Sequence, residues 1–463
     1  MDSIEGYTGR GVTIALLDSG FYPHPDLTRP ENRILAHYDV ASGKAGSLKA
    51  GRPGPWQWHG TQTSVVAAGN GFLSDGIYRA IAPEASLVLV KVSDRGRISD
   101  EAIVKGLNWV VENRERYNIR IVSMSLGGDG EISFNESIVD QAAERAVTAG
   151  LVLIAAAGNA GCTGDHRPIP PANSPSILAV GGFNDENVLG NQDLNPYCSS
   201  FGPTIDGLIK PEVVAPAIWV ASPILPQTDA YAEAEMLSEI AAAPDYQLPV
   251  LTKKYGARLG LTEVDPDELR SSVESRLREM KIVATHYQHV DGTSFAAPIA
   301  ASVAAQMIEA NPRLTPSVVR NILISTADRA PGLSLMQQGY GVINARRAVE
   351  AAMSETHVHS DCDFNPPRIE GDRLIFWFHN DTAENVTLAG EFNGWNPDSI
   401  RFERHHSGMW RAGIEIPEAG KYEYKFVIDG SVWVDDPGNA VKTDDGHGGL
   451  NSLVFIGDES KAW

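Results

Sequence analysis

The chemistry of this chain centres on a serine at the start of an alanine-rich segment. Ser294 follows Gly292 and Thr293 and precedes the run from Ala296 to Met307, whose small residues favour a tightly packed helix. The hydroxyl would then lie at a helix N-terminus, where unpaired N–H groups and the helix dipole stabilise charge on a nearby oxygen. A serine is unreactive at neutral pH without a base and a group that orients the base. A catalytic role for Ser294 therefore requires a histidine and an acid elsewhere in the sequence.

An acid and a histidine with suitable neighbours come earlier in the chain. Asp18 lies near the end of the apolar run from Gly11 to Ser19, which is typical of a buried parallel strand. Catalytic groups collect at the C-terminal edge of open α/β sheets. His59 precedes the small apolar segment 63–69, which we expect to be a buried helix. Taken singly, Asp18 could equally cap a helix or turn, and a lone histidine is more often structural than catalytic.

The elements that must position these residues follow an alternating pattern. We expect strands at 85–92, 119–126 and 151–157 because these runs are apolar and rich in β-branched residues. Residues 101–112 and 138–149 have helical spacing. Strands that alternate with helices in this way predict an α/β fold, with a mostly parallel sheet covered by helices on both faces.

Composition excludes several classes of partner. The 463 residues include 43% hydrophobic and 21% charged residues, typical of a globular protein with two or three domains. A net charge of -21 argues against nucleic acid or an anionic membrane surface as a partner. No apolar run approaches the length of a membrane span, and no signal-peptide pattern is present. The sequence as written predicts a cytoplasmic protein, or a secreted one if the N-terminus has been processed.

The three cysteines are too few for a disulfide framework. They are Cys162, Cys198 and Cys362. Cys162 and Cys198 could form a pair, but the sequence does not give the distance between them.

Four segments resemble the four signature blocks of subtilisin-like serine proteases (subtilases, peptidase S8), and they occur in the order of that family. They are DSGFYPHPDL with Asp18, HGTQTSVVAAGNG with His59, AAAGNAG with Asn159 and GTSFAAPIAA with Ser294. Blocks at 122–128 and 209–216 also resemble the family, so that the similarity covers roughly residues 5 to 350. The resemblance implies a serine endopeptidase with Ser294 as nucleophile, His59 as base and Asp18 as the orienting group. The Asn159 amide and the Ser294 N–H would bind the oxyanion.

The same resemblance implies a peptide-binding site without charged residues. One segment would pair with an extended peptide, and a second would line the first specificity pocket. These residues are Ser125, Leu126, Gly127 and Gly128 for the peptide backbone, and Ala156, Ala157 and Gly158 for the pocket. We expect protein or peptide substrates with a broad or apolar preference at the residue before the cut.

Two departures from the family pattern stand out. The first concerns the family's calcium site, because Asp26 is the only residue that can be placed on it, so structural calcium is left open. Catalysis of this kind requires no cofactor. Between residues 224 and 288 the chain carries an insertion, in which 229–242 and 265–280 are expected to be helices. The insertion could restrict the access of bulky substrates to the active site, or it could be a surface decoration.

The last portion of the chain changes character to short alternating runs separated by turn residues, which predicts an all-β, immunoglobulin-like sandwich. We expect a protease domain at 1–353, a linker at 354–368 and the sandwich at 369–463. The segments GEFNGW, YEYKFVIDG and 433–439 resemble the glycogen-binding module of AMP-activated kinase β-subunits, a CBM48-type domain.

That second resemblance implies binding of glycogen or another α-glucan. Trp395 and Trp433 would stack on glucose rings, while Lys425 and Asn451 would bond hydroxyl groups. In the alternative interpretation, the two tryptophans only pack the sandwich. For the whole chain we predict a serine endopeptidase targeted to glucan. The alternative is a glucan-binding scaffold that holds peptides without efficient turnover.

Overall fold

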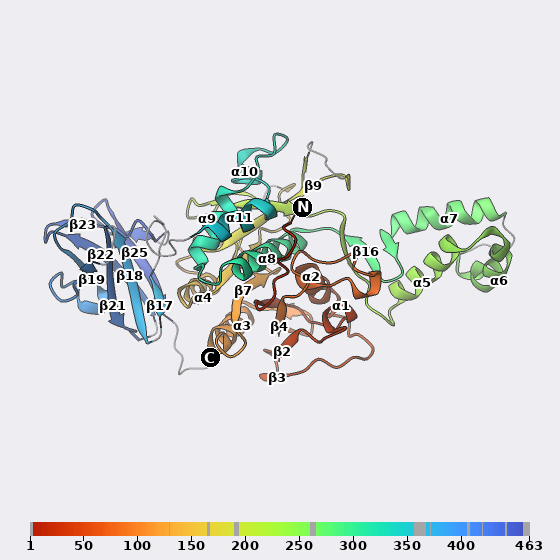
Figure 1. Ribbon diagram of the computed structural model, residues 1–463, viewed down its shortest axis with the longest axis horizontal. Helices are drawn as coiled ribbons and strands as arrows, with labels where there is room; N and C mark the ends of the chain where they lie inside the picture. Colours follow the sequence, from red (N-terminus) through yellow and green to blue (C-terminus); the bar gives the residue numbers. More distant parts are fainter. Residues whose placement is uncertain are drawn as a thin grey trace.

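The chain forms three parts along its longest axis (Figure 1). An α/β domain lies in the middle, a β-sandwich at one end and a helical arm at the other. The computed structural model describes residues 3–128, 130–163, 167–188, 194–259, 265–355, 367–370, 372–404, 408–418, 420–439 and 442–456. The segment predicted as a linker lies mostly outside these ranges.

The α/β domain is built on a mostly parallel sheet. Its strand order is β10-β9-β8-β7-β1-β4-β2-β3, with β13 paired to β9. Only the pairs β2/β3 and β9/β10 are antiparallel. The strands are β1 Thr13–Asp18, β2 Ile34–Asp39, β3 Lys44–Gly46, β4 Ser86–Lys91, β7 Ile119–Met124, β8 Val152–Ala156, β9 Leu178–Asn184, β10 Asn195–Pro196 and β13 Val213–Pro216.

Helices cover both faces of this sheet. Along β1, Ile14 and Leu16 point into one buried layer, and Ala15 and Leu17 point into the other. The first layer is closed by α2 Trp58–Ala68, α8 Thr293–Ala310, α9 Pro316–Ser325 and α11 Ala345–Ser354. The second is closed by α3 Asp100–Asn113 and α4 Ile138–Thr148. The predicted α/β fold is thereby confirmed.

Short elements complete the α/β domain at its edges. They are α1 Pro25–Thr28, η1 Phe72–Ser74, the hairpin β5 Ser93–Asp94 with β6 Arg97–Ile98, the pair β11 Gly202–Pro203 with β12 Ile209–Lys210, and α10 Leu335–Gln338.

The insertion forms a helical arm that extends away from the sheet (Figure 1). Two helices were predicted, and the described part of the insertion has three. The additional helix, α6, was missed because Gly256 lies in its interior and weakens its local helical preference. The arm has its own buried core, which includes Leu237, Leu251 and Leu269. Its elements are β14 Val220–Pro223, α5 Asp229–Ala242, η2 Asp245–Gln247, α6 Leu248–Leu259, α7 Pro266–Glu279, β15 Ile282–Ala284 and β16 Tyr287–Val290.

The C-terminal part is the predicted sandwich of antiparallel sheets. One sheet has the order β17-β18-β21-β20, and the other has the order β19-β22-β25-β24 with β23 paired to β22. Aromatic side chains such as Phe376, Tyr424 and Phe426 fill the space between them. The elements are β17 Arg368–Glu370, β18 Arg373–His379, β19 Val386–Gly390, η3 Glu391–Asn393, β20 Glu403–Arg404, β21 Met409–Glu415, β22 Gly420–Ile428, β23 Val432–Val434, β24 Lys442–Asp444 and β25 Leu450–Ile456.

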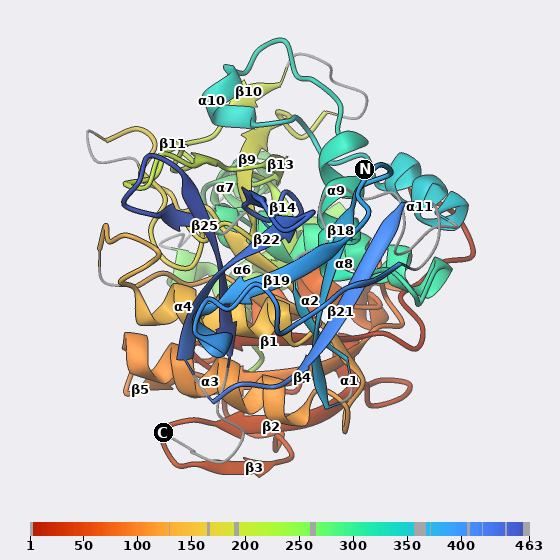
Figure 2. The same ribbon diagram turned by 90° about the vertical axis from the view of Figure 1, so that its left-hand side faces the viewer.

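The sandwich rests directly on the α/β domain. Figure 2 views the chain from this end, with the strands of the sandwich in front of the α/β domain. Helix α4 packs against β25. Leu453 of β25 is buried against Phe134 and Leu208 of the α/β domain. An apolar contact therefore joins the two domains.

Candidate active site

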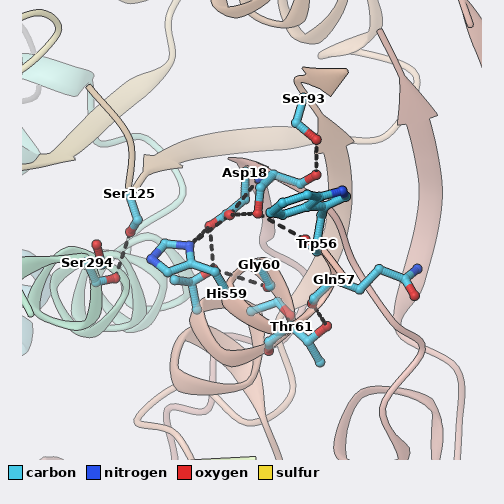
Figure 3. A network of polar contacts seen from close by, with 12 residues as sticks. Asp18, Trp56, Gln57, His59, Gly60, Thr61, Ser93, Ser125 and Ser294 are labelled. Atoms are coloured by element: carbon cyan, nitrogen blue, oxygen red, sulfur yellow. Dashed lines mark hydrogen bonds and ion pairs between the residues drawn. The ribbon is translucent and has the colours of Figure 1, made fainter. Parts of the chain in front are cut away.

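Asp18 and His59 meet at the C-terminal edge of the parallel sheet. Asp18 is the last residue of β1, which lies between β4 and β7. His59 is the second residue of α2, so the helix begins earlier than predicted and carries the histidine in its first turn. Nδ1 of His59 lies 2.8 Å from Oδ1 and 2.9 Å from Oδ2 of Asp18 (Figure 3). This contact orients the imidazole ring, with Nε2 on the side away from the carboxylate.

The Asp18 carboxylate is held by further donors that sequence reasoning did not identify. The Ser19 N–H donates to Oδ1 at 2.6 Å, and the Thr63 hydroxyl donates to Oδ2 at 3.1 Å. Thr63 lies four residues after His59 on the same helix, and residues four apart lie on the same helix face. This spacing is the sequence feature from which its position near Asp18 could have been predicted. The carboxylate is only 2% exposed. It is therefore fixed in place and shielded from water.

Burial and the Asp18 carboxylate shift the pKa of His59 in opposite directions. Burial alone would lower the pKa of His59, but the charge of Asp18 and its hydrogen bond favour the imidazolium, and together they raise the pKa above its ordinary value. Among the described residues, the ring of His59 hydrogen-bonds Asp18 only. The ring lies next to Phe295, with centroids 6.0 Å apart, and so beside the start of α8.

Ser294 is the second residue of α8, as the sequence predicted for a hydroxyl at a helix N-terminus. Gly292 precedes the helix with φ +142°, and its N–H donates to the Ala217 carbonyl at 2.7 Å. The Ser125 hydroxyl donates to the Ser294 carbonyl at 2.7 Å. Figure 3 shows Ser294 on the side of His59 away from Asp18. The three predicted residues therefore converge from β1, α2 and α8.

Asn159 lies beside the same helix. Its Oδ1 accepts hydrogen bonds from the N–H and the hydroxyl of Thr293, at 2.9 and 3.0 Å. Because the carbonyl oxygen is engaged in this way, the two amide hydrogens of Asn159 are left for another acceptor. Thr293 is the residue directly before Ser294, and no sequence pattern indicated its role.

The segment that carries Asn159 is tied to a neighbouring loop. Cys162 and Cys198 form a disulfide, so the pairing that the sequence left open is made. The Gly161 N–H donates to the Cys198 carbonyl, and the Ser200 N–H donates to the Gly158 carbonyl, both at 2.9 Å. The loop after β8 is therefore fastened on either side of Asn159.

The predicted peptide-binding segments lie at the same edge of the sheet. Strands β7 and β8 are parallel neighbours, and both end where β1 ends, so the residues that follow them are brought together. The Gly128 N–H donates to the Pro170 carbonyl at 2.8 Å. A Cβ atom at Gly128 would lie 2.9 Å from Oδ1 of Asp100, so a larger residue would not fit without a shift. The predicted residues that follow the two strands are Ser125, Leu126, Gly127 and Gly128 after β7, and Ala157 and Gly158 after Ala156, which ends β8.

Asp26, the residue considered for calcium, is occupied by protein donors. The Leu73 N–H donates to Oδ1 at 3.1 Å, and the Tyr287 hydroxyl donates to Oδ2 at 2.7 Å. No group of three or more His, Cys, Asp or Glu side chains that could hold a metal occurs within the described ranges. Asp26 therefore links β16, at the base of the arm, to the α/β domain.

The four predicted glucan-binding residues gather on the outer face of one sheet of the sandwich. Lys425 and Val427 alternate along β22 with Tyr424 and Phe426, which belong to the core between the sheets, and Trp433 of β23 pairs with the buried Val427. Asn451 lies on the neighbouring strand β25. The rings of Trp395 and Trp433 lie 6.5 Å apart with a tilt of 35°. Neither indole belongs to the core between the sheets, and Trp433 is 43% exposed.

Two carboxylates hold the polar residues of this face. Lys425 Nζ lies 2.6 Å from Oδ2 of Asp445, and Asn451 Nδ2 lies 2.7 Å from Oε2 of Glu423. The hydrogen bond from Lys425, followed by those from the backbone of His447 and Gly449, keeps the pKa of Asp445 well below its usual range. The loop 445–449 is thereby folded around Asp445, next to Lys425.

The chain is similar to known proteins in two regions. Residues 9–341 match the model of the subtilase family, and residues 373–461 match a model described as the glycogen recognition site of AMP-activated protein kinase. The serine protease AprX of Bacillus subtilis (strain 168) is 32% identical over 355 residues, which cover 74% of this chain and 67% of AprX. Subtilisin E of the same strain is 35% identical over 187 residues, which cover 40% of this chain and 44% of that relative.

A solved structure shows the same fold. Fervidolysin from Fervidobacterium pennivorans, described as a keratinolytic enzyme related to subtilisin, has a TM-score of 0.53 at 19% identity. The match covers 91% of this chain and 53% of that chain. The family match spans most of the α/β domain and includes Asp18, His59, Asn159 and Ser294. The chain therefore belongs to the subtilase family of serine endopeptidases and carries a C-terminal domain of the glycogen-recognition type.

Proposed function

We propose that this endopeptidase cleaves peptide bonds with Ser294 as nucleophile, His59 as general base and Asp18 as the group that orients the base. The observation that carries the proposal is the double contact of His59 Nδ1 with the Asp18 carboxylate, beside the helix N-terminus that bears Ser294. With Nδ1 protonated and bonded to Asp18, Nε2 of His59 has the lone pair that a base needs.

The reaction proceeds in two halves. Ser294 Oγ attacks the carbonyl carbon of the substrate while His59 takes its proton, and the imidazolium that forms is stabilised by Asp18. His59 then gives this proton to the leaving amine, so that an acyl-enzyme remains. A water molecule, activated by His59, releases the acid product and restores the free enzyme.

The negative charge on the carbonyl oxygen is met by two donors. These are the Asn159 amide and the Ser294 N–H at the start of α8, where the helix dipole adds to the effect. Thr293 fixes the Asn159 carbonyl oxygen, so the amide hydrogens are oriented before the charge develops. Removing such a side-chain donor in subtilisin costs roughly 100- to 1000-fold in kcat, and we expect a loss of that size for Asn159→Ala.

Substrate binding uses the ends of the neighbouring strands. An extended peptide pairs with the backbone at Ser125, Leu126, Gly127 and Gly128 by strand addition, for which the glycines leave room. The side chain before the cut enters a pocket lined by Ala156, Ala157 and Gly158. These residues carry no charge, so the preference at that position is broad or apolar.

The sandwich recruits the enzyme to glycogen or another α-glucan. The exposed ring of Trp433 and the half-buried ring of Trp395 offer stacking surfaces for the C–H faces of glucose. Lys425 and Asn451 lie on the same face and supply N–H donors for hydroxyl groups. The partners in this proposal are protein or peptide substrates and a glucan.

Cleavage of an unfolded protein tests the enzymatic part. The wild-type chain should cut denatured casein at internal sites identified by mass spectrometry, and Ser294→Ala should abolish these cuts. Ser275→Ala, on the exposed surface of α7, is the matched control. Equal cleavage by Ser294→Ala would refute the assignment of the nucleophile. Peptide binding without cleavage by the wild type would favour a scaffold.

Migration in a glycogen-containing native gel tests the glucan part. In an inactive Ser294→Ala background, the full chain should be retarded by glycogen, and Trp395→Ala or Trp433→Ala should weaken the retardation. Val432→Ala, at the exposed residue next to Trp433, should leave it unchanged. Equal retardation of all these variants would show that the indoles are not the binding surface.

A further inference from the structure

Two large aromatic side chains are exposed beside the candidate active site. Trp56 is 48% exposed and Trp58 is 52% exposed. The ring of Trp58 stands edge-on to the ring of His59, with centroids 5.4 Å apart and an interplanar angle of 89°. Single exposed apolar residues are common, but here one exposed indole lies against the candidate base and the other is two residues away in the chain.

Trp56 is seated against the backbone of a neighbouring hairpin. A Cβ atom at Gly96, between β5 and β6, would lie 2.7 to 2.8 Å from three atoms of the Trp56 ring, so only glycine allows this contact. The Ser19 hydroxyl donates to the Trp56 carbonyl at 3.1 Å, and the Ser93 hydroxyl donates to the Ser19 carbonyl. Trp56 is thus fixed between the end of β1 and the hairpin (Figure 3).

The loop between the two tryptophans is rigid as well. Gln57 Oε1 accepts from the Gly54 N–H at 2.6 Å, and Gln57 Nε2 donates to the Phe21 carbonyl at 2.5 Å. Because Gln57 is turned inward to make these bonds, its neighbours Trp56 and Trp58 face outward. Preformed aromatic surfaces lose little conformational entropy when they bind a side chain.

The strand order determines which part of a substrate meets these rings. Along the edge of the sheet, the pocket lies at the end of β8, the peptide-binding segment follows β7, and Asp18 with His59 lies at β1. Side chains of an extended peptide alternate between opposite sides. If the residue before the cut (P1) points toward β8, then the residue before it (P2) points toward β1, where Trp56 and Trp58 lie.

We propose that Trp56 and Trp58 form an apolar subsite that selects an aromatic or large aliphatic side chain at P2. The inference rests on the proposed function, because it uses the peptide path along the segment after β7. Such a subsite makes the enzyme selective at P2 as well as at P1, where the pocket is uncharged. The two indoles are specificity-determining residues, and neither takes part in proton transfer.

A set of peptides with a constant P1 and a varied P2 residue tests this proposal. We expect wild-type kcat/KM for Phe or Leu at P2 to exceed that for Ala by about tenfold, near the lower end of the range for apolar pockets. The double variant Trp56→Ala/Trp58→Ala should lose most of this preference and keep its activity on the Ala peptide. The variant Trp56→Ala/Trp58→Phe, which keeps an aromatic ring at position 58, should retain part of the P2 preference. Tyr246→Ala, at an exposed aromatic residue of the helical arm, should behave as wild type.

Labelling of Ser294 with a fluorophosphonate distinguishes failure of the P2 subsite from failure of the proposed function. If the labelled, active wild type has no P2 preference, or the double variant keeps it, the subsite is refuted while the proposed function stands. A change confined to the residue after the cut would also refute it, because the indoles would then lie on the leaving side. If the wild type neither labels nor cleaves, the proposed function fails and the subsite falls with it.

Discussion

Two side chains decide the reactivity of this site at the scale of single residues. Asp18 and His59 both lie in a largely buried place, where an unpaired imidazolium would be costly. The charge and hydrogen bond of Asp18 more than compensate, so the pKa of His59 lies above its ordinary value. If His59 is the base, as proposed, it is in its neutral, active form only above this pKa, so activity should rise as the pH rises through it.

Replacing the carboxylate by an amide should move this pH dependence. In Asp18→Asn the charge that raises the pKa of His59 is gone while burial, which lowers it, remains, so the midpoint of the kcat/KM profile should shift to lower pH. The maximal rate should fall by about 10⁴-fold, because the amide favours the wrong tautomer. Asp328→Asn, at an exposed carboxylate paired with Arg347, is the control. A midpoint that does not move would contradict the assigned role of Asp18.

The sequence allowed a prediction of the site residues because each lies in a short segment with a recognisable context, and the structure brings Asp18, His59 and Ser294 to one edge of the sheet. Asp18 ends an apolar strand, and Ser294 begins a helix of small residues. Their supporting residues could not be predicted in this way, since Thr63, Thr293 and Trp56 act through contacts between segments that are far apart in the sequence or through loop geometry. Sequence patterns report strongly on buried periodicity and weakly on such contacts.

At the scale of elements, the loop after β8 depends on its disulfide. Cys162 lies three residues after Asn159, and its bond to Cys198 holds the loop next to the segment 198–200. We expect Cys162→Ser/Cys198→Ser to lower stability by about 3 kcal/mol and to lower kcat more than it raises KM, because Asn159 would be less well positioned.

Reductant provides the control for this prediction. Dithiothreitol should lower kcat of the wild type to the level of the double variant and have no effect on the double variant itself. A kcat that is unchanged by both treatments would show that Thr293 alone is sufficient to position Asn159.

The helical arm shows where element prediction failed. Helices α5 and α7 were expected within a few residues of their bounds, while α6 was missed. Its apolar residues Leu248, Leu251, Tyr255 and Leu259 do follow a helical spacing, but Gly256 in the interior disfavours a helix in isolation. Packing in the core of the arm outweighs this weak local preference.

The arm can be removed without touching its anchor in the α/β domain. Replacing residues 227–285 by a short loop leaves Tyr287, which donates to Asp26, in place. Peptide hydrolysis should therefore be retained. If the arm restricts bulky substrates, the ratio of casein to peptide cleavage should rise, and an unchanged ratio would identify the arm as a peripheral decoration.

At the scale of the whole molecule, the sandwich is fastened to the α/β domain by an apolar contact. Leu453 is 1% exposed although it lies on the outer face of its sheet, because Phe134 covers it. The same face carries Asn451 two residues earlier, so the predicted glucan surface borders the contact between the domains. Burying a leucine contributes about 2 kcal/mol, enough to favour one arrangement of the two domains.

A charge in this contact should release the sandwich. In an inactive Ser294→Ala background, Leu453→Asp should speed chymotrypsin cleavage of the chain after Phe364, because an ionised carboxylate cannot be buried against Phe134 without cost. Leu450→Asp, at an exposed residue of the same strand, is the matched control. Equal cleavage rates for the two variants would show that the contact does not hold the domains together.

The location of the protein in the cell remains a prediction. No helix among the described residues is long and apolar enough to cross a membrane. The sequence patterns predicted a cytoplasmic protein, whereas a disulfide such as Cys162–Cys198 is typical of proteins in oxidising compartments. Counting free thiols in protein taken directly from fractionated cells would decide between the two locations.

The most direct test of the account is covalent labelling of the full chain with a fluorophosphonate, read by intact mass and peptide mapping. The reagent reacts quickly only with a serine that is activated by its base and faces an oxyanion site. We expect stoichiometric labelling at Ser294 that is lost in Ser294→Ala and slowed in Asp18→Asn. A folded sample that is not labelled, or is labelled at another serine, would contradict it.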